Sequence, residues 1–414
     1  MSRPDTRPPF AKPPLAAGHL TDRGLDPPEK LPTITVGRPS RHPSIFKSRL
    51  AHTDPAAGHG DLVRLVLKDG EPFGFGIYNP RAEIAVRRLT TGTDVPDSRW
   101  WRSKLEEAVS LRTTLLGLGD TDAIRLVHGE GDGLPGLVVD KYANVLVAEV
   151  FSLGLWQRRR SVLELLAEMT GAEHLVARPG PRTEAQEGFV AEADVTDGCP
   201  HDLKIAEHGV RYAIDPAGGH KTGFFCDQRD NRALVGRHAA GRDVLDLCCY
   251  TGGFALNAAA GGAKSVTAVD LDEHAVAAAK QNAKLNRRPG LKVVHADAFN
   301  YLRDVLAAEK RYGLIVLDPP KLIGSQHESE SGKRTYADLN RLAMKLLAPG
   351  GLLLTCSCSG LLSPDEFKTI VARSVPGDRT ARVLAVHGAA PDHPVATDTP
   401  ETHYLKAIWM SFSS

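Results

Sequence analysis

The chain has 414 residues, of which 42% are hydrophobic and 24% are charged, and its formal net charge at pH 7 is only +1. This length allows two or three domains with buried cores. The small net charge excludes attraction of nucleic acid by a positive electrostatic potential over the whole surface. The sequence has no run of about 18 apolar residues and no apolar leader segment, and its six cysteines lack zinc-finger spacing. We therefore expect a cytoplasmic protein with reduced cysteines, no membrane span and no bound metal.

The first half of the chain predicts three consecutive units. Residues 1–32 are rich in proline, glycine and charge and contain few aliphatic side chains, so we expect a disordered extension. Short alternating runs separated by turn residues predict a small strand-rich domain over residues 33–95. Helical spacing at 100–116, followed by apolar strand runs, predicts a central α+β domain over residues 96–215.

The rhythm changes in residues 216–414, where short apolar runs alternate with alanine-rich helical segments. This alternation predicts βαβ units and a mainly parallel sheet. The expected fold class is therefore α/β, with a Rossmann-like C-terminal domain preceded by the two smaller domains.

The carboxyl ends of four predicted strands each carry an aspartate. The first strand ends at Asp246 and is followed by a turn that contains Tyr250, Thr251 and Gly252. The next three predicted strand ends bring Asp270, Asp297 and Asp318. Because the carboxyl ends of parallel strands meet at one edge, these residues predict a pocket for a nucleoside-like cofactor, although a single such aspartate would more often be only a cap.

The cofactor predicted from this pattern is S-adenosylmethionine. The turn lacks the G-x-G-x-x-G spacing of dinucleotide-binding proteins, and Asp318 is followed by two prolines and Lys321, which is typical of methyltransferases. Upstream, in the segment 220–232, Phe225, Asp227, Gln228 and Arg229 are candidates for covering the methionine end of the cofactor. The alternative is an ordinary helix start capped by Asp227.

Six stretches together resemble the large-subunit rRNA methyltransferase I type of 23S rRNA cytosine-5 methyltransferase, and the resemblance extends over about residues 33–414. The stretches are Lys221–Arg232, Asp246–Phe254, Asp318–Lys321, Cys356–Gly360, Ala390–Pro394 and Pro400–Lys406. The resemblance implies a PUA domain over 33–95, a methyltransferase domain over 216–414 and 23S-type rRNA as the partner. It departs at Ser44, where the family usually has an aromatic residue, and at Cys226 and Cys248, where larger apolar residues are common.

Cytosine-5 methylation requires a nucleophile, because carbon 5 of cytosine reacts only after a thiolate has added to carbon 6. We expect Cys358 to be this nucleophile, because it stands at the end of a buried strand run, and we keep Cys356 as the second choice. For either residue alone, a small buried hydrophobic role is the commoner one. The other four cysteines, including the pair Cys248 and Cys249 inside the turn, are expected to be structural.

The remaining site residues concern the RNA. Asp318 is expected to hold the cytosine edge, and Lys321 is a candidate for contact with phosphate or base. Arg41 and His42 are expected to help the N-terminal domain to dock RNA, mainly on the strength of the resemblance. Two alternatives stay open: methylation of a guanine nitrogen without a covalent adduct, and a non-catalytic RNA-binding protein. The sequence also leaves a homodimer open.

Overall fold

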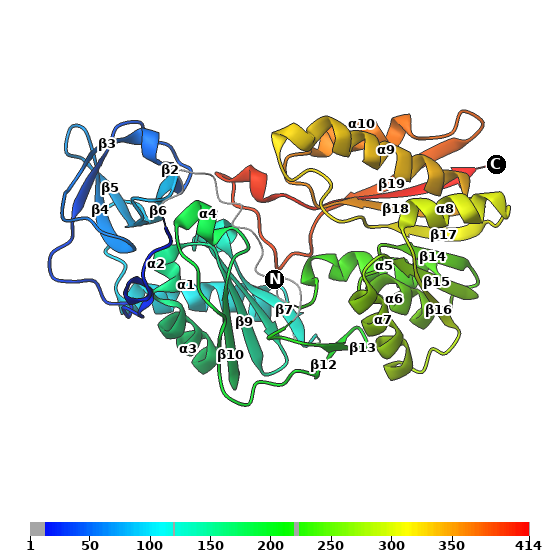
Figure 1. Ribbon diagram of the computed structural model, residues 1–414, viewed down its shortest axis with the longest axis horizontal. Helices are drawn as coiled ribbons and strands as arrows, with labels where there is room; N and C mark the ends of the chain where they lie inside the picture. The colour runs from blue at the N-terminus through cyan, green and yellow to red at the C-terminus, as the bar shows by residue number, and fades with distance from the viewer. Residues whose placement is uncertain (1–12, 119–120, 219–222, 414) are drawn as a thin grey trace.

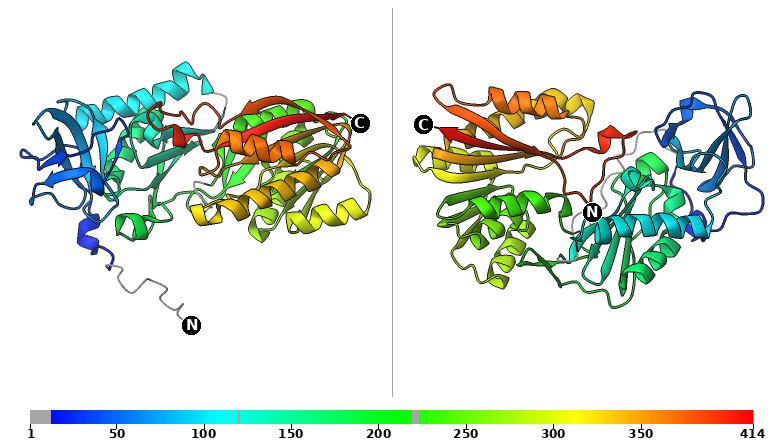
Figure 2. Two further views of the ribbon diagram at one scale, coloured as in Figure 1. Left: turned by 90° about the horizontal axis from the view of Figure 1, so that it is seen from above. Right: turned by 180° about the vertical axis from the view of Figure 1, so that it is seen from behind.

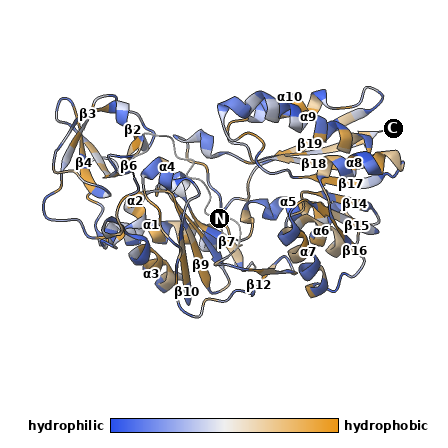
Figure 3. Ribbon diagram, in the orientation of Figure 1, coloured by the Kyte–Doolittle hydropathy of each residue, from blue (hydrophilic) through white to orange (hydrophobic). Residues whose placement is uncertain are grey.

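The computed structural model describes residues 13–118, 121–218 and 223–413. Three units lie in a row (Figures 1 and 2): an N-terminal sheet, a central sheet with its helices, and a C-terminal domain with a third large sheet. Figure 3 shows that hydrophobic residues follow the strands of the central and C-terminal sheets, whereas hydrophilic residues gather in the loops. Within the described residues, no helix combines the length and the hydropathy needed to cross a bilayer.

The N-terminal unit is a six-stranded sheet in the order β2-β6-β5-β4-β1-β3. All paired strands are antiparallel except β1 and β4, and Ile34, Val63 and Val86 belong to its buried core. Its elements are β1 (Thr33–Val36), β2 (Ser44–Phe46), the 3-10 helix η2 (Lys47–Arg49), β3 (Leu50–Thr53), β4 (Asp61–Leu67), β5 (Pro72–Tyr78) and β6 (Ile84–Thr90). The prediction of a small strand-rich domain is confirmed.

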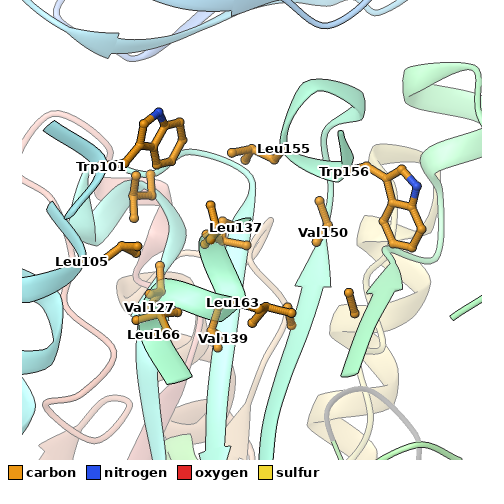
Figure 4. Packing of buried hydrophobic residues seen from close by; sticks show 14 of the residues in the cluster. Trp101, Leu105, Val127, Leu137, Val139, Val150, Leu155, Trp156, Leu163 and Leu166 are labelled. Carbon is orange, nitrogen blue, oxygen red and sulfur yellow. The ribbon is translucent and has the colours of Figure 1, made fainter. Parts of the chain in front are cut away.

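The central unit is a five-stranded sheet in the order β11-β10-β9-β8-β7, with helices packed on it. Figure 4 shows Trp101 and Leu105 of α1 close to Val127 and Leu137 of the sheet. Asp97 caps α1 by accepting a hydrogen bond from the backbone N–H of Trp100. The elements are α1 (Ser98–Ser110), a π-helical turn (Leu111–Leu115), β7 (Ala123–His128), η5 (Gly129–Asp132), β8 (Leu137–Tyr142), β9 (Val145–Val150), α2 (Leu153–Trp156), α3 (Arg159–Thr170), β10 (His174–Pro179), α4 (Thr183–Glu187) and β11 (Asp194–Val195).

The described part of the N-terminal extension is ordered against the central unit, so the prediction of disorder is wrong for residues 13–32. The backbone N–H of Leu15 donates to the carbonyl of Gly188 at 2.9 Å, and Gln157 donates to the carbonyl of His19 at 2.6 Å beside the 3-10 helix η1 (Ala17–Leu20). Leucines at positions 15, 20, 25 and 31 pack against the central hydrophobic core. Their burial offsets the cost of ordering a segment whose overall composition is polar. Residues 1–12 lie outside the described residues.

The C-terminal domain follows a two-stranded hairpin, β12 (Leu203–Glu207) and β13 (Val210–Ile214). Its seven-stranded sheet has the order β16-β15-β14-β17-β18-β20-β19, in which β14 to β18 are parallel and β20 lies antiparallel between β18 and β19. The strands are β14 (Asp243–Leu247), β15 (Ser265–Asp270), β16 (Leu291–His295), β17 (Tyr312–Leu317), β18 (Leu347–Ser357), β19 (Thr380–His387) and β20 (Lys406–Ser413). The direction of winding reverses between β14 and β17, which is where such sheets bind ligands.

Helices connect the strands of this sheet as the alternating sequence pattern predicts. They are the 3-10 helix η6 (Cys226–Gln228), α5 (Arg229–His238), α6 (Gly253–Ala260), α7 (Glu273–Leu285), α8 (Ala298–Ala307), η7 (Gln326–Glu328), α9 (Ser329–Lys345), α10 (Pro364–Arg373) and η8 (Pro400–Thr402). The predicted α/β class with a Rossmann-like C-terminal domain is confirmed. The exact domain boundaries at 32, 95 and 215 remain predictions.

Candidate active site

The carboxyl ends of the parallel strands open into one cavity of about 710 Å³, a size suited to a small-molecule cofactor. Its walls come from η6, from the turn after β14, from the ends of β15, β16 and β17, and from the segments around β18 and β20. Ten of the predicted site residues line it: Phe225, Asp227, Gln228, Tyr250, Thr251, Asp270, Asp297, Asp318, Lys321 and Cys358. His220, Lys221 and Thr222 of the predicted cofactor segment lie outside the described residues.

The turn after β14 takes an uncommon backbone path. Cys248, Tyr250 and Gly252 have φ values of 60°, 49° and 84°. Non-glycine residues rarely adopt this left-handed region, so the turn is specifically shaped where it borders the cavity. Gly252 is not among the lining residues, and its contribution is the backbone conformation at the start of α6.

Asp246 does not line the cavity, so the structure corrects the expectation of a direct ligand contact. Its side chain is fully buried in β14, and its Oδ2 accepts a hydrogen bond from the backbone N–H of Ala255 at 2.9 Å. Burial raises the pKa of Asp246 well above its usual value, and the nearby charges of Asp318 and Asp270 raise it further. Asp246 therefore supports the first turn of α6 from beneath.

Two of the strand-end acids shape the wall and face the cavity at the same time. Asp270 accepts hydrogen bonds from the backbone N–H groups of Tyr250 at 2.8 Å and of Asp272 at 2.9 Å, so it joins the end of β15 to the turn after β14. Asp297 caps α8 by accepting from the N–H of Asn300 at 3.0 Å. Asp297 is thus both a helix cap and a cavity-lining acid. For this residue the cap interpretation and the cofactor-pocket interpretation are compatible.

Asp318, Gln228 and Asp227 also line the cavity. Gln228 Nε2 donates to Asp318 Oδ2 at 3.0 Å, which connects η6 with the end of β17. The hydroxyl of Tyr404 donates to Asp227 Oδ2 at 2.6 Å. Burial raises the pKa of Tyr404 well above its usual value, and the charge of Asp227 raises it further. Sequence reasoning missed Tyr404, because no local pattern signals a contact across 177 positions.

Arg229 points away from the cavity, contrary to expectation. It is 1% exposed, and its two terminal nitrogens donate to Asp392 at 2.8 and 2.9 Å. Burial alone would raise the pKa of Asp392, but hydrogen bonds from His393 and Arg229 hold this pKa below its usual range. Segment 388–405 carries Asp392 and reaches from the C-terminal domain toward the central unit, where the backbone N–H of Arg125 also donates to Asp392 at 3.0 Å (Figure 1).

Arg41 and His42 lie in the N-terminal unit and are not among the cavity-lining residues. The carbonyl of Arg41 accepts a hydrogen bond from Arg88 at 2.6 Å, and His42 Nε2 lies 2.5 Å from Glu401 Oε1 of η8. The loop that was expected to dock RNA therefore contacts the C-terminal part of the chain. Its role in binding RNA stays a prediction.

The structure separates the two candidate nucleophiles. Cys356 is fully buried among the hydrophobic residues of β18 and its neighbours, and burial raises its pKa well above the usual value. Cys358 follows the last residue of β18, is partly exposed and lines the cavity together with Asp318. Cys248 and Cys249 also line the cavity, and burial raises the pKa of both. A nucleophilic thiol must ionise and be reached by its target, and the raised pKa values of Cys248, Cys249 and Cys356 count against these three, which leaves Cys358 as the candidate.

The family of S-adenosylmethionine-dependent methyltransferases matches this chain over residues 124–402. The chain belongs to this family. A PUA-like domain family matches residues 39–91, which confirms the expected character of the N-terminal unit. S-adenosylmethionine is therefore the methyl donor of this methyltransferase, as the strand-end acids predict.

Named relatives match nearly the whole chain. Ribosomal RNA large subunit methyltransferase I of Pseudoalteromonas atlantica is 37% identical over 373 residues, which cover 89% of this chain and 94% of the relative. The protein of the same name from Klebsiella pneumoniae is 35% identical over 374 residues, with the same two coverages of 89% and 94%.

Solved structures agree on the fold. A SAM-dependent methyltransferase from Streptococcus mutans superimposes with a TM-score of 0.76 at 20% identity, covering 92% of this chain and 99% of the other. A methyltransferase structure in complex with SAH gives a TM-score of 0.76 at 19% identity, with coverages of 92% and 99%. At such identities the likeness shows the shared architecture.

The polar side chains that line the cavity suit S-adenosylmethionine as a ligand. Asp227, Asp270, Asp297 and Asp318 line it together, and carboxylates suit a positively charged sulfonium, ribose hydroxyls and an adenine amino group. The aromatic rings of Phe225 and Tyr250, which also line the cavity, meet edge to face with their centroids 4.8 Å apart. Of the described lining residues, Arg232 and Lys321 are the cations, and Arg232 is already bonded to Glu207 at 2.6 and 2.7 Å. The set is therefore poorly suited to a dinucleotide pyrophosphate.

Proposed function

We propose that this methyltransferase modifies carbon 5 of a cytosine in large-subunit ribosomal RNA through a covalent adduct with Cys358. The relatives that match 89% of the chain carry the name ribosomal RNA large subunit methyltransferase I, which supports the RNA class. The observation that carries the chemistry is the partly exposed Cys358 in the same cavity as Asp318.

The proposed cofactor contacts follow from the order of the strand ends in the sheet. We propose that Asp270 accepts hydrogen bonds from ribose hydroxyls and Asp297 from an adenine amino group, and that Asp227, Gln228 and Asp318 contact the rest of the cofactor. Phe225, Tyr250 and Thr251 supply the remaining surface, and Gly252 lets the chain turn into α6. When bound, S-adenosylmethionine supplies an electrophilic methyl group.

The proposed chemistry assigns each chain residue one task. The Cys358 thiolate forms a bond to carbon 6 of the cytosine, and the electron pair this releases makes carbon 5 nucleophilic. Asp318 accepts a hydrogen bond from the amino group of the ring, and also from N3 once N3 carries a proton in the adduct, and so stabilises the adduct. After carbon 5 is methylated, it loses its proton, the bond between sulfur and carbon 6 breaks, and the thiolate leaves.

The target base must leave its stack to reach this cavity, as in other enzymes that do chemistry on a base. Lys321 is exposed at the cavity, where it is suited to a phosphate or a base edge. Arg41 and His42 belong to the PUA-like part of the chain and are proposed to contact RNA outside the cavity.

RNA containing 5-fluorocytidine tests the adduct directly. Fluorine at carbon 5 cannot leave as a proton does, so the covalent protein–RNA species persists and migrates slowly on a denaturing gel. We expect the adduct with the unaltered protein and with Cys356→Ala, and none with Cys358→Ala. An enzyme that methylates ordinary rRNA but forms no adduct would contradict the proposal and would favour methylation of a guanine nitrogen.

A further inference from the structure

The segment that carries Cys358 is held by buried hydroxyl groups. Ser357 and Ser359 flank the cysteine, and both have 0% exposure. The Tyr336 hydroxyl lies 2.9 Å from Ser357 Oγ and 2.9 Å from Ser359 Oγ. The backbone N–H of Ile323, five residues after Asp318, also donates to Ser359 Oγ at 3.2 Å. The Cys358 segment and the loop after Asp318 are therefore tied to one another.

Lys406 completes this arrangement from the start of β20. Its side chain is 1% exposed, and its ammonium donates to the carbonyl of Ser359 at 2.6 Å and to the carbonyl of Tyr404 at 2.8 Å. Ser359 directly follows Cys358, so the positive charge of Lys406 is bonded to the same short segment as the thiol. Tyr404, in turn, bonds to Asp227 of the cavity wall.

A buried ammonium is costly unless something compensates its charge. Within the described part of the chain, the hydrogen-bond partners of Lys406 are neutral carbonyls. Burial lowers the pKa of Lys406 to about 8. The charge of a Cys358 thiolate opposes this effect by raising the pKa of Lys406. Glu366 raises this pKa further and Lys321 lowers it, and the charge of Cys358 also acts on Tyr336 and on Cys356, which Asp318 influences as well.

We propose that Lys406 is a positioning residue: it fixes the Cys358 segment through the Ser359 carbonyl and holds a positive charge one residue along the chain from the Cys358 thiolate. The inference rests on the proposed role of Cys358 as the nucleophile. The charge favours the thiolate before the attack on carbon 6, and it favours the thiolate again when the bond to carbon 6 breaks.

The pH profile of Cys358 alkylation tests the proposal without RNA. Full-length protein is treated with iodoacetamide between pH 6 and 10, and peptide mass spectrometry follows Cys358 by itself. In Lys406→Met we expect the midpoint of the profile to move up by about one pH unit, with alkylation at pH 7 slowed about tenfold. Lys406→Arg keeps the charge and should stay close to the unaltered protein. The exposed Lys345→Met serves as the control and should change nothing.

An unchanged profile in a folded Lys406→Met protein would overturn the proposal. If circular dichroism shows that this variant does not fold, the reciprocal measurement decides. In protein labelled with ¹³C at lysine Cε, Cys358→Ser should lower the pKa of Lys406 below about 8, because the negative charge beside it is gone, and an unshifted titration would overturn the proposal. A shifted alkylation profile without a 5-fluorocytidine adduct would instead contradict the proposed function and leave the charge pairing intact.

Discussion

Two groups of acids in this chain have opposite surroundings. In the cavity, Asp270 and Asp297 accept hydrogen bonds from backbone N–H groups, and Asp318 accepts one from a neutral amide. Between the central unit and the C-terminal domain, Asp132 and Asp392 are bonded to buried guanidinium groups, at 2.5 Å from Arg112 and at 2.8 Å from Arg229.

The difference lies in what neutralises the charge. At the interface the arginines do so permanently, and Arg112 also donates to the carbonyl of Asp392 at 2.8 Å, which joins α1's end to segment 388–405. At the cavity the carboxylates remain able to meet a cationic ligand that carries hydrogen-bond donors. The acids with arginine partners lie where the central unit meets segment 388–405, and the acids with neutral donors line the cavity. Each prediction below tests one side of this contrast.

The largest expected loss of stability comes from Asp392→Asn. The substitution leaves the buried Arg229 with only the exposed Asp230, at 3.7 Å, as a counter-charge, and breaking a buried pair costs about 3–5 kcal/mol in comparable cases. Urea unfolding followed by tryptophan fluorescence measures the loss. The control is Asp338→Asn, which breaks a solvent-exposed pair with Arg341 and should cost less than about 1 kcal/mol. Equal losses in the two variants would break the contrast.

Asp270→Asn should weaken cofactor binding rather than the stability of the fold. We expect affinity for S-adenosylmethionine, measured by calorimetry, to fall about 10- to 100-fold, because a charged acceptor becomes neutral. The free energy of unfolding should change by no more than about 1 kcal/mol. Asp243→Asn, at the amino end of the neighbouring strand β14, is the matched control and should bind the cofactor normally. Normal binding by Asp270→Asn would show that this acid is only structural.

The interface should weaken in acid through His128. Burial, with the charge of Arg125 next, lowers the pKa of His128 to about 2. Below about pH 6.5 the unfolded chain binds a proton that the folded chain does not, so stability falls as the pH falls, by up to about 1.4 kcal/mol per pH unit. Urea midpoints at pH 5, 6 and 7 should fall less steeply in His128→Gln. A slope identical to that of the unaltered protein would count against the effect.

An exposed acid gives the smallest effect and the scale for the others. Glu366 lies 2.9 Å from Lys333 and accepts from Ser363 in the capping box of α10, and these bonds lower the pKa of Glu366 to about 2. Its contribution is present above the unfolded pKa of about 4.5 and is lost as the pH falls toward 2. Because the pair is exposed, Glu366→Gln should cost less than about 1 kcal/mol at pH 7, read as faster amide exchange in α10.

The cavity could be predicted well from the sequence because the pattern that marks it lies within short stretches of the chain. An apolar run followed by an acid marks the end of a buried parallel strand, and such ends meet at one edge of the sheet. For that reason Asp270, Asp297 and Asp318 could be grouped before any contact was known. This pattern could not show that Asp246, unlike the other three acids, does not line the cavity. Its position inside β14, beneath the turn, depends on how α6 packs.

Long-range contacts could not be predicted. Arg229 sits among predicted cofactor residues but turns to Asp392, 163 positions away, and Tyr404 reaches Asp227 over 177 positions. The leucines at positions 15 and 20 are too sparse to signal a buried segment, and they order the extension only because the central unit offers an apolar surface. Composition describes a segment by itself, whereas its order depends on what it packs against.

The identity of the methylated nucleoside tests the central claim most directly. Unmodified large-subunit rRNA is incubated with the protein and with S-adenosylmethionine carrying a labelled methyl group, then digested to nucleosides and analysed by mass spectrometry. We expect labelled 5-methylcytidine from the unaltered protein and from Cys356→Ala, and none from Cys358→Ala. A labelled methylguanosine, or 5-methylcytidine formed equally well by Cys358→Ala, would contradict the claim.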